Sequence, residues 1–204
     1  MKILFQGDSI TDAERDRRNY HDLGRGYPKY AAEFINQAHP DMDIEFVNLG
    51  ISGNRTGQLF DRLRQDAIEI QPDIVSILIG INDIWHRYAF DMVATYDEQI
   101  ELNYRCILKE LRDKTNAKIM ILSPYLLDCH DKDQIREDLK KVLPMIKKLA
   151  DEYADIYVPL NEYFDEAMKT MPAPRYYSGD GVHPNTNGSV FIGKIYAEAI
   201  EKLL

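Results

Sequence analysis

Short apolar runs rich in Ile and Val alternate with longer segments of helical period along this chain, and few folds accept that alternation. The apolar runs are residues 3–6, 44–48, 74–79, 118–122 and 156–158. Several are almost continuously apolar, as expected of parallel strands buried on both faces. The intervening segments predict helices at 27–37, 58–70, 96–114, 134–152 and 189–203. Together these elements predict a three-layer α/β/α sandwich around a five-stranded parallel sheet.

The length and charge of the chain exclude some classes of protein. With 204 residues, we expect a single domain over 1–204. The 25 Lys and Arg against 34 Asp and Glu give a net charge of −9, and the cations form no block. Proteins that bind nucleic acids usually present a basic face, so we expect no nucleic-acid partner.

The N-terminal residues and the lengths of the apolar runs predict the cellular location of the protein. The residues before Gly7 are too few for the apolar region of a signal peptide, and no cleavage site follows them. No apolar run approaches the roughly 18 to 20 residues of a membrane-spanning helix. We therefore expect a cytoplasmic protein without a membrane partner.

The cysteines and one histidine give no sign of a metal or redox site. Cys106 and Cys129 are too far apart for a Cys-x-x-Cys motif and too few for a disulfide-rich scaffold, so we expect free thiols. His130 has aspartates nearby, but that segment is typical of a solvated acidic loop. We therefore expect no metal.

A polar turn follows the first predicted strand. Gly7-Asp8-Ser9 would place Ser9 at the opening of a helical turn, where backbone N–H groups point outward and can bind an anion. The ordinary alternative is a helix N-cap, a position that Ser and Asp both favour. This short motif alone does not decide between the two.

The turns after the second and third strands are also polar. Gly50 and Gly53 follow the second strand, without the glycine pattern of dinucleotide binding or the lysine of a phosphate loop. Asn82 follows the third strand, and its amide could stabilise an oxyanion or simply satisfy a local turn. The carboxyl ends of parallel strands meet at one edge, so we expect these turns to converge there.

A further candidate site lies near the C-terminus. Asp180 and His183 are three positions apart in a glycine-containing loop. The carboxylate could accept from Nδ1 of the imidazole and leave Nε2 facing a nucleophile. The alternative is an exposed histidine beside a helix cap formed by Asn185 or Thr186, and the two interpretations are compatible.

Considered together, the four motifs described above resemble the SGNH hydrolase superfamily, also called GDSL esterases and lipases. These motifs contain Ser9, Gly53, Asn82, and the pair of Asp180 and His183. The resemblance spans residues 7–184 in the order and approximate spacing of the family, with Ile10 where the family name has Leu. Residues 7–12, 23–27 and 80–85 are similar to bacterial intracellular esterases that remove acetyl groups from xylo-oligosaccharides. The resemblance implies a flavodoxin-like fold, a serine esterase, no cofactor, and a homo-oligomer.

The resemblance also implies roles for individual residues. Ser9 would be the nucleophile, His183 the general base, and Asp180 the group that orients the imidazole. The oxyanion hole would consist of the backbone N–H groups of Ser9 and Gly53 with the side-chain amide of Asn82.

The substrate is less constrained by the sequence. Aromatic residues flank two of the motifs, and flat rings can stack on sugar faces but are also ordinary core residues. The candidate substrate-binding residues are Asp8, Trp85 and Tyr177. The resemblance implies a small-molecule ester substrate with a short acyl group, an acetylated oligosaccharide. A lysophospholipase or thioesterase with the same catalytic residues is the alternative, followed by a non-catalytic binding module.

Overall fold

The five apolar runs form one parallel sheet. The computed structural model describes residues 1–128, 131–171 and 173–204. Its sheet has the strand order β2-β1-β3-β4-β5, and every neighbouring pair is parallel. The strands are β1 (Lys2–Gly7), β2 (Glu45–Asn48), β3 (Ile74–Leu78), β4 (Lys118–Leu122) and β5 (Ile156–Val158). The predicted α/β class and the five-stranded parallel sheet are confirmed.

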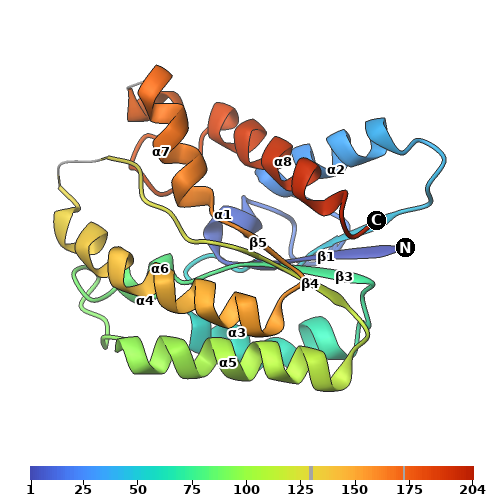
Figure 1. The fold of residues 1–204 in the computed structure, drawn as a ribbon, viewed down its shortest axis with the longest axis horizontal. Helices are drawn as coiled ribbons and strands as arrows, with labels where there is room; N and C mark the ends of the chain where they lie inside the picture. The colour runs from blue at the N-terminus through green and yellow to red at the C-terminus, as the bar shows by residue number, and fades with distance from the viewer. Residues whose placement is uncertain (129–130, 172) are drawn as a thin grey trace.

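Helices cover both faces of this sheet, with α2, α7 and α8 on one face and α3, α5 and α6 on the other (Figure 1). The helices are α1 (Ser9–Asp12), α2 (Tyr27–Ala38), α3 (Thr56–Leu63), α4 (Ile81–Trp85), α5 (Asp97–Lys114), α6 (Asp133–Tyr153), α7 (Leu160–Thr170) and α8 (Thr186–Ile200). A π-helical turn, η1 (Arg64–Ile68), continues α3, and a 3-10 turn, η2 (Pro174–Tyr176), follows α7.

The core lies between the sheet and the two helical layers. Every residue of β3 is buried, as expected of a central parallel strand. On α5 the predicted apolar stripe is fully buried, and its members are Ile100, Tyr104, Ile107, Leu108 and Leu111. Burial of such side chains contributes roughly 1.5 to 3 kcal/mol each, so this stripe anchors α5 to the sheet.

Two helices were not expected from the sequence, whereas α1 matches the helical turn expected at Ser9. Helix α4 is about one turn long, too short to show a period. Helix α7 buries only Leu160 and Phe164, a stripe too sparse to stand out. Helix α8 begins ahead of its predicted range because the Asn185 side chain caps it, accepting from the Gly188 N–H at 3.2 Å.

The parallel arrangement brings the turns after β1, β2 and β3 to one edge of the sheet.

Among the described residues, no helix has the length and apolarity needed to cross a membrane. Cys106 is a free thiol. The predictions for Cys129 and His130 fall outside the described residues.

Candidate active site

The turn after β1 places Ser9 at the first position of α1. A Cβ atom at Gly7 would collide with the Thr11 side chain and the Leu78 carbonyl, so this turn requires glycine. The N-cap is Asp8, whose Oδ1 accepts from the Ile10 N–H at 3.0 Å. Because Asp8 caps the helix, the Ser9 hydroxyl is left for another partner.

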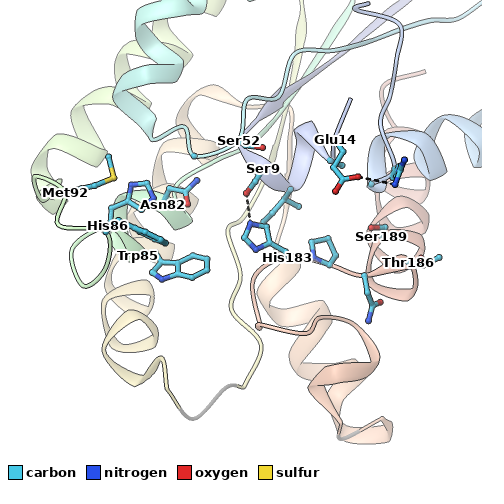
Figure 2. A pocket seen from close by; sticks show the side chains of 18 residues that line it. Ser9, Glu14, Ser52, Asn82, Trp85, His86, Met92, His183, Thr186 and Ser189 are labelled. Carbon is cyan, nitrogen blue, oxygen red and sulfur yellow. Dashed lines mark hydrogen bonds and ion pairs between the residues drawn. The ribbon is translucent and has the colours of Figure 1, made fainter. Parts of the chain in front are cut away.

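That partner is His183. The Ser9 Oγ lies 2.9 Å from the His183 Nε2, although the two residues are far apart in sequence. On the other side of the ring, Nδ1 lies 2.7 Å from the Asp180 Oδ2. A carboxylate only accepts hydrogen bonds, so Nδ1 carries the proton and Nε2 of the neutral ring accepts from Ser9. Figure 2 shows the Ser9 and His183 side chains pointing at each other.

The loop that carries Asp180 and His183 is held by its own hydrogen bonds. The Asp180 Oδ1 accepts from the N–H groups of Val182 and His183 at 2.9 and 2.8 Å. The Ser178 hydroxyl donates to the His183 carbonyl at 2.7 Å, and the Tyr125 hydroxyl donates to the Val182 carbonyl at 3.0 Å. These contacts fix the orientation of the imidazole.

The electrostatics of this pair favour charge separation. Burial alone would raise the pKa of Asp180, but the hydrogen bonds from the His183 ring and backbone outweigh burial and hold that pKa well below its usual range. The hydrogen bond to Asp180 raises the pKa of His183 above its ordinary value. The negative charges of Asp180 and Asp8 act in the same direction. The site therefore stabilises a protonated imidazole.

Two potential hydrogen-bond donors complete the site. Gly53 has a φ of +80°, in the left-handed region that favours glycine, while a Cβ there would meet nothing within 4 Å. The glycine is therefore needed for its backbone conformation. The Asn82 Nδ2 donates one hydrogen to the Asn54 carbonyl at 3.1 Å, which leaves its second hydrogen available.

Helix α4 holds Asn82 in place. Gly80, with a φ of +122°, turns the chain from β3 into this helix. The buried Asp83 accepts from the N–H and hydroxyl of Thr56 at 2.9 and 2.8 Å, which ties α4 to the start of α3. Burial raises the pKa of Asp83 to about 6.

A cavity of about 820 Å³ opens over these groups, and Ser9, Gly53, Asn82 and His183 all line it. Trp85, Phe90 and Met92 contribute an apolar part of the lining. The Trp85 ring lies 5.9 Å from the His183 ring, measured between centroids.

A charged pair lies elsewhere on the cavity lining. Glu14 and Arg25 both line the cavity and pair at 3.2 Å. Figure 2 shows Trp85 and Met92 on one side of Ser9 and Glu14 on the other. The cavity therefore has an apolar side and a charged side.

Two of the three expected substrate-binding residues do not line this cavity. Asp8 is 1% exposed and acts as a cap, and burial raises its pKa to about 7. Tyr177 is 8% exposed and packs against Phe164 and Phe191, with ring centroids 5.6 and 5.2 Å away. Asp8 is therefore buried at the start of α1, and aromatic packing covers Tyr177. Trp85 does line the cavity.

Several cavity residues carry no signal in the sequence. Phe90 and Met92 lie in the irregular segment between α4 and α5, where no periodic pattern distinguishes them. Glu14 has a φ of 63°, an uncommon conformation for a residue with a side chain.

Within the described residues, no group of three or more His, Cys, Asp or Glu side chains could hold a metal ion.

Comparison with known proteins agrees with this geometry. Residues 5–190 match the GDSL-like lipase/acylhydrolase family. The chain belongs to that family. It is 31% identical to an acetylxylan esterase from Geobacillus stearothermophilus, over 98% of this chain and 93% of that protein. A crystal structure of that esterase superposes with a TM-score of 0.90.

Two other relatives extend the comparison. A GDSL-like lipase from Parabacteroides merdae is 34% identical, covers 100% of this chain and 96% of its own, and has a TM-score of 0.92. An arylesterase from Vibrio mimicus is 23% identical over 100% of this chain and 90% of that protein. This member of the family is a carboxylic ester hydrolase.

Proposed function

We propose that this hydrolase cleaves short-chain acyl esters, chiefly acetyl esters of carbohydrates, with Ser9, His183 and Asp180 as its catalytic triad. The observation that carries the proposal is the continuous path from the Ser9 Oγ to His183 at 2.9 Å and from His183 to Asp180 at 2.7 Å. Three solved variants of the Geobacillus stearothermophilus esterase are described as catalytic mutants. They replace a serine, an aspartate, and a histidine three positions after that aspartate. Asp180 and His183 have that same separation.

In the first half of the reaction, the Ser9 Oγ attacks the ester carbonyl carbon while the His183 Nε2 takes the hydroxyl proton. The resulting tetrahedral intermediate collapses, and the alcohol leaves with that proton. Asp180 keeps the imidazole in the required tautomer and stabilises its charged form. The product of this half is an acyl-enzyme on Ser9.

Three donors would hold the oxyanion during this step. They are the backbone N–H groups of Ser9 and Gly53 and the second hydrogen of the Asn82 amide. In the second half, His183 takes a proton from water as its oxygen attacks the acyl-enzyme. The second tetrahedral intermediate then collapses, the Ser9 Oγ leaves with the proton returned by His183, and the acid is released. Loss of one such donor in a hydrolase costs on the order of 10² to 10³ in kcat.

The substrate class rests on the relatives and on the cavity. An acetylxylan esterase is similar to almost the whole chain. Sugar rings are recognised by aromatic faces together with polar groups, and this cavity combines Trp85 and Phe90 with the Glu14–Arg25 pair. The cavity is large enough for a sugar unit, and a short acyl group would lie against Ser9 while the alcohol part occupies the remaining volume.

Acyl-chain preference tests this assignment. We expect kcat/KM for p-nitrophenyl acetate to exceed that for p-nitrophenyl octanoate by about tenfold or more, because a site for a short acyl group cannot place the longer chain productively. Acetylated xylo-oligosaccharides should release acetate under the same conditions. A preference for octanoate would contradict the short-chain assignment and favour the lysophospholipase or thioesterase alternative.

The pH profile tests His183 as the base. The imidazole must be neutral to accept the Ser9 proton, so kcat/KM should be full at high pH and fall as the pH drops through the His183 pKa. Since that pKa is raised above 6.5, the midpoint should lie above pH 6.5. The measurement is kcat/KM for p-nitrophenyl acetate, with circular dichroism confirming the fold at each pH. A flat profile between about pH 5 and 8 would contradict the role of His183.

A further inference from the structure

Arg62 lies on α3, outside the motifs described above, and does not line the catalytic cavity. Its side chain is only 12% exposed. A buried guanidinium is costly unless its donors are satisfied, so the partners of Arg62 show which groups it holds.

Two of these partners are backbone carbonyls at the edge of the sheet. Nη2 donates to the carbonyl of Gly7 at 3.1 Å, and Nη1 donates to the carbonyl of Leu49 at 2.8 Å. Gly7 ends β1 and lies two positions before Ser9. Leu49 begins the turn that leads from β2 to Gly53. The guanidinium therefore connects the two segments that carry the proposed backbone donors.

A third partner connects Arg62 to Asn82. The Arg62 Nε donates to the Asn54 Oδ1 at 2.9 Å, and the Asn54 carbonyl accepts from the Asn82 Nδ2 at 3.1 Å. Asn54 also directly follows Gly53. One side chain thus reaches, directly or through Asn54, all three segments that supply oxyanion donors.

The remaining partners hold the guanidinium itself. Nη1 lies 2.8 Å from the Asp66 Oδ2, one turn further along the chain, and 2.8 Å from the Gln6 Oε1. The Gln6 Nε2 donates in turn to the Asp66 carbonyl at 2.6 Å. The ion pair with Asp66 compensates the burial of the Arg62 charge, and the hydrogen bond to Gln6 fixes the plane of the guanidinium. Only arginine supplies five donors in one rigid plane.

We propose that Arg62 is a positioning residue of the esterase, whose guanidinium sets the relative placement of the Ser9, Gly53 and Asn82 oxyanion donors. This inference rests on the proposed roles of those three residues. Arg62 touches no substrate. It acts by holding the turn after β1, the turn after β2 and, through Asn54, the start of α4 in one register.

The first test is Arg62→Lys, which keeps the positive charge but removes the planar guanidinium group. We expect kcat for p-nitrophenyl acetate to fall about 10²-fold, the size of effect that misplacement by about 1 Å produces. KM should change by less than about threefold, because donors specific to the transition state do not contribute to ground-state binding. Arg64→Lys is the matched control, since that side chain is 83% exposed and should leave both constants unchanged.

A double-mutant cycle separates positioning from a general loss of stability. If Arg62 acts through the oxyanion donors, Arg62→Lys should cost at least about tenfold less in an Asn82→Ala background than in the wild type. A fall in the amount of folded enzyme would multiply with the Asn82→Ala effect. If Arg62→Lys does not fold, Arg62→Gln with Asp66→Asn removes both charges of the buried pair and enters the same cycle.

The results of these experiments either support or overturn the positioning role of Arg62. Lower kcat with unchanged KM and a reduced effect beside Asn82→Ala supports the proposal. Wild-type kcat in Arg62→Lys, or losses that multiply, overturns it. If Asn82→Ala itself retains full activity, the oxyanion assignment fails, and that result is distinct from failure of the role of Arg62.

Discussion

Ser9→Ala is expected to lower kcat for p-nitrophenyl acetate by roughly a million fold while the protein remains folded. The substitution removes one oxygen whose hydrogen bond to His183 is at the exposed mouth of the site. No core contact is lost, because the α1 cap comes from Asp8. The measurement is steady-state hydrolysis with stringently purified protein, since trace contamination by a host esterase would mask a loss of this size.

The same assay is applied to His183→Ala and to the double variant of Ser9 and His183. In the proposed mechanism the nucleophile and base act as a unit, so the double variant should be about as inactive as either single variant. His39→Ala is a suitable control, since that imidazole pairs with Glu201 at 2.9 Å and does not line the cavity. Wild-type rates in purified Ser9→Ala would remove Ser9 from the mechanism.

Asp180→Asn is expected to lower kcat about 10⁴-fold, the cost of presenting the wrong imidazole tautomer. The oxygen of the introduced amide can still accept from the N–H groups of Val182 and His183, so the loop should keep its shape. The nitrogen of that amide, however, donates to Nδ1 where the carboxylate accepted. The proton then moves to Nε2, which can no longer accept from the Ser9 hydroxyl.

Asp16→Asn is the matched control for this change. Asp16 is exposed, pairs with Arg18 at 3.1 Å and does not line the cavity, so its substitution should leave kcat unaltered. A thermal unfolding curve for each variant separates chemistry from folding. Turnover of Asp180→Asn within about tenfold of the wild type would contradict the orienting role of Asp180.

The sequence predicted the elements whose signal is local. Strands such as β3 are continuous apolar runs because they are buried on both faces, and the stripe of α5 repeats with a clear helical period. The turns after β1, β2 and β3 could be placed at one edge because parallel strands share a direction. Strand burial and the topology of parallel sheets therefore account for most of the fold.

Contacts between distant segments could not be predicted in the same way. Asp8 and Tyr177 are beside the motifs in sequence, but helix capping and aromatic packing remove both from the cavity. Phe90 reaches the cavity from an irregular segment without a period. Arg62 is one of the two charged residues on α3, and only its buried contacts with the ends of β1 and β2 distinguish it.

The most direct test of the catalytic assignment is covalent labelling by a serine-reactive fluorophosphonate, followed by mass spectrometry of the proteolytic peptides. We expect one adduct per chain, located on Ser9, and a large loss of labelling rate in His183→Ala, because the imidazole activates the hydroxyl. No adduct, or an adduct on another residue with Ser9 unmodified, would contradict the proposed triad.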